Sequence, residues 1–143
     1  MKFKADEFVP SKWDTAADKA RFCNAFVRFV EGGFKLDQFP ETFYRRLSSC
    51  FGHIAHFNRD GFYETFFTDE RGKLRFLEMA AEHACYGQAE FSYSDAEMAL
   101  RSWVRTTGQV EAQLAKLRAS TEASERARLR ELAAKYPDEI GAK

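Results

Sequence analysis

The sequence lacks any long apolar run, and this absence limits where the protein can act. No stretch of the 143 residues approaches the roughly 18 consecutive apolar residues of a membrane span. The opening segment MKFKADEFVP places charged residues where a signal peptide needs apolar ones. We therefore expect a cytoplasmic protein with no membrane partner.

Cysteine is scarce as well. The three cysteines, Cys23, Cys50 and Cys85, are odd in number and widely spaced, which argues against a disulfide framework and predicts reduced thiols. A chain of 143 residues can bury one hydrophobic core without disulfides or a structural metal. Because aromatic residues make up 15% of the chain and fifteen are phenylalanine, that core should be bulky.

The chain also lacks net charge, and its pI near 6.8 is far from the basic values of domains that bind duplex nucleic acid alone. The charge is nevertheless uneven, since residues 101–135 hold only four acidic side chains. Such a local surplus of positive charge could steer an anionic partner, although a solvated helix face is the commoner cause. The basic residues of this segment are Arg101, Arg105, Lys116, Arg118, Arg126, Arg128, Arg130 and Lys135.

Helical periodicity dominates the rest of the sequence. Apolar stripes predict a helix over 14–31, with Thr15 and Asp18 at capping-box spacing and Gly32-Gly33 at its end. The segment 34–39 is expected to be a connector. Further helices are predicted from Pro40 to Cys50, over 62–67, over 73–85, and from a Ser94/Glu97 capping box to Gly108, with turns at 58–61 and 69–72.

These patterns predict an all-α fold, a single compact domain of five to six helices with a charged C-terminal helical arm. Residues 1–108 form the aromatic-rich core and residues 109–143 form the arm. The apolar stripe of the arm lapses near Ser120-Thr121, so one long helix and two shorter ones both fit residues 109–136. Because an incomplete stripe gains little by standing alone, we expect self-association through the arm to give a homodimer. The residues predicted to mediate it are Val110, Leu114, Leu117, Leu129 and Leu132.

The stretch CFGHIAHFNRDGFYETFF, residues 50–67, concentrates side chains that bind metals. Thiolate and imidazole are the ligands that zinc prefers, so a zinc site is one hypothesis. Three-residue steps, however, drift around a helix, and the pattern matches no established zinc signature. The candidate ligands are Cys50, His53, His56, His83 and Cys85.

Two other interpretations of this stretch stay open. In the structural one, which we favour, His53, His56, Asn58 and Asp60 form hydrogen bonds that hold a tight turn. In the catalytic one, His56 acts as a base that Asp60 orients, in a small enzyme using His53, His56 and Asp60. The sequence contains no nucleophile elbow, phosphate-binding loop, dinucleotide fingerprint or HExxH motif, so we expect no enzyme and no cofactor.

Aromatic residues between positions 39 and 67 outnumber those a helical domain of this size comfortably hides. We therefore expect some of them to reach the surface and bind a protein partner, together with arginines of the arm. A nucleic acid is expected only as part of a complex with protein. The predicted partner-binding residues are Tyr44, Tyr63, Phe66, Phe67, Arg118, Arg126 and Arg130.

The segment GHIAHFNRDGFYETFF resembles stretches of small uncharacterised bacterial accessory proteins carried on plasmids and phages. Small helical proteins of that type often bind host or defence machinery, as anti-CRISPR inhibitors do. The resemblance covers about a ninth of the chain and implies no catalytic residue. It favours a non-enzymatic binding protein, such as a mobile-element-encoded inhibitor or modulator of host defence machinery.

Overall fold

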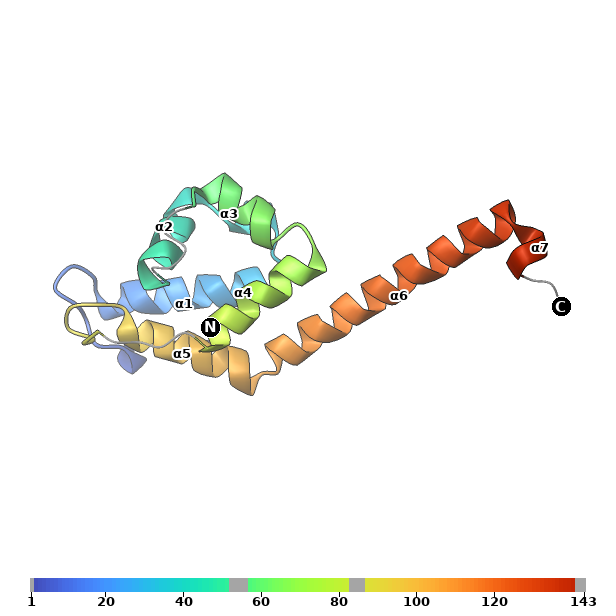
Figure 1. Cartoon of the computed structure of the whole chain (residues 1–143). Coiled ribbons are helices and arrows are strands. Elements are labelled where there is room, and N and C mark those ends of the chain that lie inside the picture. The colour runs from blue at the N-terminus through green and yellow to red at the C-terminus, as the bar shows by residue number, and fades with distance from the viewer. Residues whose placement is uncertain (1, 52–56, 83–86, 141–143) are drawn as a thin grey trace.

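The computed structural model describes residues 2–51, 57–82 and 87–140, and those ranges contain helices, turns and loops but no strand. The predicted all-α fold is confirmed. Figure 1 shows a helical body and a long helix that leaves it. The helices are α1 (Ala16–Glu31), α2 (Glu41–Cys50), α3 (Arg59–Phe66), α4 (Glu70–Glu82), α5 (Ser94–Thr106), α6 (Gln109–Lys135) and α7 (Pro137–Ile140), with short 3-10 turns η1 (Ala5–Glu7) and η2 (Leu36–Gln38).

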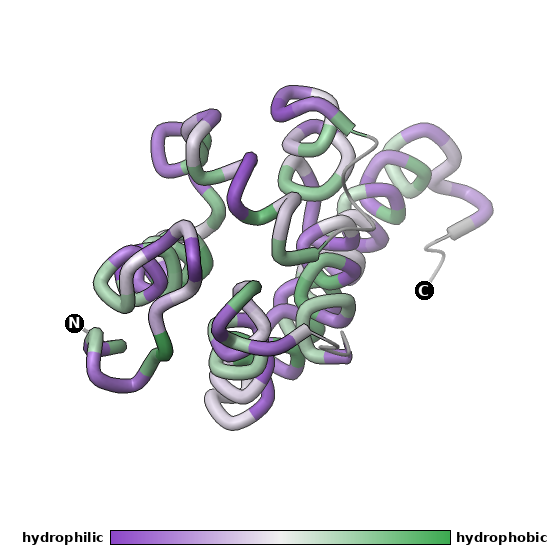
Figure 2. The backbone as a smooth tube through the Cα atoms, turned by 90° about the vertical axis from the view of Figure 1, so that its left-hand side faces the viewer, coloured by the Kyte–Doolittle hydropathy of each residue, from purple (hydrophilic) through white to green (hydrophobic). Residues whose placement is uncertain are grey.

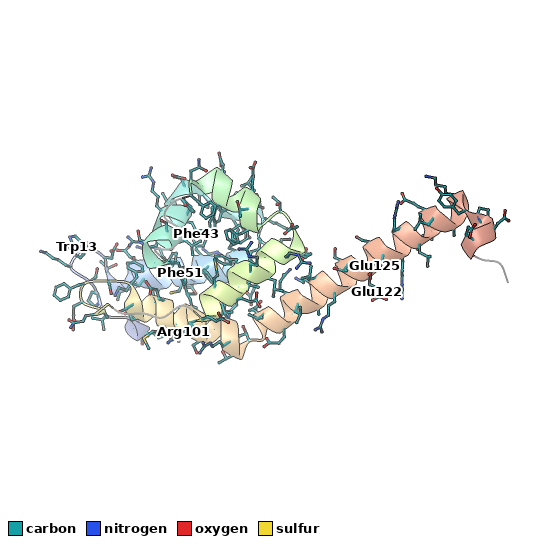
Figure 3. All side chains as sticks on the ribbon, in the orientation of Figure 1. Trp13, Phe43, Phe51, Arg101, Glu122 and Glu125 are labelled. Carbon is teal, nitrogen blue, oxygen red and sulfur yellow. The ribbon has the colours of Figure 1, made fainter. Side chains whose placement is uncertain are left out.

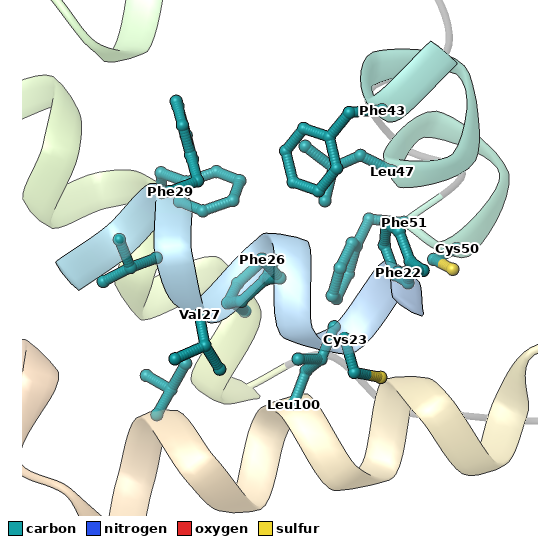
Figure 4. Packing of buried hydrophobic residues seen from close by; sticks show 14 of the residues in the cluster. Phe22, Cys23, Phe26, Val27, Phe29, Phe43, Leu47, Cys50, Phe51 and Leu100 are labelled. Carbon is teal, nitrogen blue, oxygen red and sulfur yellow. The ribbon is translucent and has the colours of Figure 1, made fainter. Parts of the chain in front are cut away.

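Helix α1 is the centre of the body. It begins with the predicted capping box, in which Thr15 Oγ1 accepts a hydrogen bond from the Asp18 amide and the Asp18 carboxylate accepts one from the Thr15 amide. Its phenylalanines and Cys23 are buried on several sides, so α1 lies between α2 and α5 (Figure 4). Gly33, at a φ of 89°, ends the helix in a backbone region that suits glycine.

The aromatic core is continuous from α1 to α4. Phe39, from the η2 connector, is fully buried and stacks on Phe29 with ring centroids 5.0 Å apart. Phe67 meets Phe29 edge-on at 4.9 Å and Phe76 of α4 at 5.0 Å. Edge-on and offset contacts of this kind suit the charge distribution of aromatic rings, so the many phenylalanines pack mainly against one another.

Three predicted local features differ from the structure. The turn at 69–72 lies at the start of α4, which begins at Glu70 and not at 73, and Asp69 Oδ1 accepts a hydrogen bond of 2.7 Å from the Gly72 amide. The turn at 58–61 is the first turn of α3, because Asn58 Oδ1 accepts a hydrogen bond of 2.6 Å from the Gly61 amide and caps the helix. The Ser94/Glu97 capping box is wrong: Tyr93 is the N-cap of α5 and makes no side-chain capping bond, whereas the Ser94 amide donates to Ser92 Oγ at 3.2 Å.

Residues 109–135 form one continuous helix, α6, which is the first of the two predicted alternatives. It starts after Gly108, whose φ of 68° turns the chain out of α5. Gln113 is buried against α4, whereas every residue from 118 to 131 is exposed. Figure 1 shows α6 running away from the body and carrying α7 at its tip, and Figure 2 shows the same chain from the end opposite to the arm. Within the described ranges, no helix has both the length and the apolar character to cross a bilayer.

Candidate protein-binding surfaces

The aromatics predicted to bind a partner belong to the core. Tyr44, Phe66 and Phe67 are buried, and Tyr63 is only partly exposed. The hydroxyl of Tyr44 donates to the Phe57 carbonyl and that of Tyr63 to the Phe34 carbonyl, each at 2.6 Å. Burial raises the pKa of both phenols. The expectation that the rings reach the surface is therefore wrong for Tyr44, Phe66 and Phe67, which the aromatic core encloses, whereas Tyr63 keeps part of its surface exposed.

Most of the Cys/His cluster lies outside the described residues. His53, His56, His83 and Cys85 fall there, so the zinc and catalytic hypotheses stay predictions. Cys50 is buried at the end of α2. In the described ranges, no group of three or more His, Cys, Asp and Glu side chains is placed to hold a metal ion.

The other members of the predicted turn are described. Asn58 caps α3, and Asp60 is exposed in the first turn, with its carboxylate 3.3 Å from Arg59 Nε. The hydrogen bonds that we assigned to the two histidines stay a prediction.

The exposed aromatics lie elsewhere. Among the described residues, three aromatic side chains are classed as exposed, namely Trp13 at 70%, Phe91 at 60% and Tyr136 at 49%. Trp13 and Phe91 border the same pocket of about 240 Å³. Figure 3 shows Trp13 pointing outward at the end of the body opposite to the arm. We call this pocket and its two rings the Trp13/Phe91 surface.

Hydrogen bonds join and shape the two segments that carry the rings. The Lys12 amide donates to the Glu90 carbonyl at 3.0 Å, which joins the segment before α1 to the segment before α5. Ser11 Oγ accepts from the amides of Trp13 and Asp14, at 3.3 and 3.0 Å, and so shapes the turn that carries Trp13. The two rings therefore project from loop segments that hydrogen bonds hold in place.

Arg46 forms the polar floor of the surface. Its guanidinium carbon lies 4.1 Å from the centre of the Tyr93 ring, and one of its nitrogens lies 3.1 Å from Asp14 Oδ1. Burial raises the pKa of the Tyr93 phenol, while the nearby Arg46 charge lowers it to a smaller extent. The phenol therefore stays neutral at physiological pH, and the pocket offers a positive and a negative group close together.

A buried ion pair supports this surface from below. Lys19 is fully buried, and its Nζ donates to Asp95 Oδ1 and to the Ala89 carbonyl, both at 2.9 Å. Asp95 Oδ2 in turn accepts from the Val9 amide at 2.9 Å. One carboxylate thus joins α1, α5 and the N-terminal segment, because each supplies a donor to it.

The predicted arginines of the arm are all exposed. Arg126 pairs with Glu122 at 2.5 Å, within one helix turn. Arg118 and Arg130 form no ion pair within the part of the chain that the structure describes. The five predicted self-association residues divide into two groups: Val110, Leu114 and Leu117 lie near the body, and Leu129 and Leu132 lie near the tip.

Sequence reasoning missed Trp13 and Phe91. Both residues precede a helix start and lie outside every apolar stripe, and this position could have predicted their exposure. An aromatic residue in a polar loop has no helix face through which to enter the core. Comparison with protein-family models, with curated proteins and with solved structures found no match to the chain.

Proposed function

We propose that this chain is a non-enzymatic binding protein that docks a protein partner on the Trp13/Phe91 surface. The observation that carries the proposal is the pairing of the two most exposed aromatic rings among the described residues at one pocket. Binding energy in protein interfaces concentrates on a few residues, and Trp, Tyr and Arg are enriched among them. The surface combines all three types, since Arg46 and Tyr93 lie behind the two rings.

The chemistry of the pocket defines the kind of partner. Trp13 and Phe91 suit an apolar side chain that inserts between them, and leaving these rings in water has a free-energy cost that docking removes. The Arg46 guanidinium and the Asp14 carboxylate suit a polar group next to that apolar side chain, such as a backbone amide or carbonyl. A protein segment offers both within one or two residues.

A narrower form of the proposal follows the resemblance to plasmid- and phage-borne proteins. In this form the partner belongs to host defence machinery, and binding inhibits or modulates it. The exposed arginines of the arm would then contact acidic groups of the same complex, including nucleic acid held by a protein. The arm supports this form by presenting Arg118 and Arg130 without ion-pair partners among the described residues.

Affinity purification with quantitative mass spectrometry tests the proposal. The tagged full-length chain is compared with a Trp13→Ala/Phe91→Ala variant in extracts of the native host. Both rings are exposed, so the variant should keep its stability. Loss of a central interface residue costs at least about 2 kcal/mol, or roughly 30-fold in Kd, so capture of the partner should nearly vanish.

Leu36→Ala is the matched control, because Leu36 is a similarly exposed apolar side chain that does not line the pocket. This control should capture the partner as the unmodified chain does. Equal capture by the double variant, or no protein enriched by the unmodified chain, would show that the Trp13/Phe91 surface is not a docking site.

A further inference from the structure

The large apolar residues of α6 and its C-cap have palindromic spacing: the steps between them are the same from either end of the helix. Near the body they are Val110, Leu114 and Leu117, and near the tip they are Leu129, Leu132 and Tyr136. With Thr121 and Glu125 between them, the steps along the chain are four, three, four, four, four, three and four residues. At 100° per residue all eight lie within about 60° of the direction of Leu114, so they form one stripe along the helix.

The body covers only the start of this stripe, where Val110 packs against the core and Leu114 and Leu117 are half-buried. Gln113 makes the buried contact with α4, where its Nε2 donates to Glu70 Oε2 at 2.6 Å and to the Glu70 carbonyl at 3.1 Å. Leu114 lies about 100° around the helix from Gln113, whereas Val110 and Leu117 lie about 60° and 40° from it, so the body shares the start of the stripe. Near the tip, Leu129 is 54% exposed and Tyr136 is 49% exposed. Apolar side chains exposed in two clusters on one side of a helix favour a covering surface.

We propose that a second copy of this chain covers the stripe, by pairing its α6 antiparallel to the first about a two-fold axis next to residue 123. In this register Leu114 meets Leu132 of the second copy, and Leu117 meets its Leu129. Val110, which packs against the core of its own body, lies at the level of Tyr136. An interface between identical copies about a two-fold axis must be self-complementary, and a stripe with palindromic spacing meets that requirement.

Charge complementarity supports the same register. Glu125 lies within the stripe and Arg118 lies on the same side of it, about 40° from the direction of Leu114, and neither forms an ion pair within the described part of the chain. In the antiparallel pair, Arg118 of one copy lies within one helix turn of Glu125 of the other, on the same flank. The two-fold axis repeats the contact, so two unpaired arginines and two unpaired glutamates are matched.

This dimer goes beyond the proposed function and does not depend on it. The arm and the Trp13/Phe91 surface lie at opposite ends of the molecule (Figure 3). Pairing through the arms therefore leaves two docking surfaces free, facing away from each other. Such a molecule can engage two partner sites at once, which strengthens binding when both are within reach.

Sedimentation velocity of the full chain, up to about 100 µM, tests the dimer because association follows mass action. We expect a dimer for the unmodified chain and a monomer for Leu129→Glu/Leu132→Glu. Ala123→Glu/Ala127→Glu is the matched control, because it adds the same two charges on the exposed face that points away from the stripe and should remain dimeric. A monomeric unmodified chain, or a Leu129→Glu/Leu132→Glu variant that stays dimeric, overturns the proposal.

Zero-length carbodiimide cross-linking of the unmodified chain tests the register. Glu111 and Lys135 are about 36 Å apart along one helix at 1.5 Å per residue, so a bond between them within one chain is excluded. In the antiparallel pair they lie at the same level of the two helices. We expect a Glu111–Lys135 isopeptide bond in the cross-linked dimer, identified by mass spectrometry. A dimer whose cross-links lack this bond refutes the antiparallel register.

Discussion

Replacing Asp95 with alanine tests the joint that supports the Trp13/Phe91 surface. The change leaves Lys19 fully buried with the Ala89 carbonyl as its remaining hydrogen-bond acceptor among the described residues and the centre of the Tyr93 ring 5.5 Å from Nζ, since the other hydrogen bond of Nζ goes to the deleted carboxylate. Removing one member of a buried ion pair typically costs about 3–5 kcal/mol, because the other charge stays uncompensated. The Asp95 side chain is 20% exposed, so water can reach the vacated site and the lower figure applies. We expect a loss of about 3 kcal/mol and a Tm lower by roughly 10 °C.

Lys19→Met separates a lost ion pair from lost packing. Methionine fills a similar volume without a charge, and Asp95 keeps the Val9 and Ala96 amides as donors. Its cost should be only about 1 kcal/mol, and adding Asp95→Ala should then cost less than Asp95→Ala does alone. Urea unfolding followed by far-UV circular dichroism measures all three variants. Equal losses for the two single variants, or a loss below about 1 kcal/mol for Asp95→Ala, would refute the reasoning.

Two further predictions concern α4. Gly72→Ala should destabilise the chain by about 1–3 kcal/mol in thermal unfolding, because an added Cβ would lie 2.6 Å from the Phe66 carbonyl oxygen. An unchanged stability would show that the backbone moves aside easily. The second concerns Glu70, whose pKa is lowered from its ordinary 4.5, chiefly by the hydrogen bond from Gln113. This hydrogen bond therefore adds to the free energy of unfolding above pH 4.5, and its contribution is lost as pH falls through the lowered pKa. Gln113→Leu should therefore cost about 1.5 kcal/mol at pH 7 and clearly less at pH 3, and an unchanged difference would contradict the assignment.

Helix positions followed from the sequence where local chemistry decides them. The start of α1 was predictable because Thr15 and Asp18 satisfy each other's backbone donors, a contact that needs no tertiary partner. At α5 the same pattern failed. Tyr93 is buried against Phe22 and Arg46, and this packing makes it the N-cap in place of Ser94. Tertiary contacts thus override a local signal.

The candidate site was harder to predict from the sequence, because the number of aromatic residues does not show which of them are exposed. Counting aromatics predicted a surplus at the surface, yet Phe39 and Phe67 are buried because the rings of the body share contacts with one another. The exposed pair comes from two segments far apart in sequence. Trp13 and Phe91 are brought together by the Lys12–Glu90 hydrogen bond and the Lys19–Asp95 ion pair. Neither contact has a sequence signature.

Hydrogen–deuterium exchange on the full chain, with and without the partner protein that it captures, tests the proposed docking surface most directly. The account predicts slower exchange on binding at the amides of residues 11–14 and 88–93, which carry the two exposed rings. The amides of the η2 connector, Leu36–Gln38, should exchange as before. Slower exchange confined to α6 or to the connector, with residues 11–14 and 88–93 unchanged, would contradict the assignment of the Trp13/Phe91 surface as the docking site.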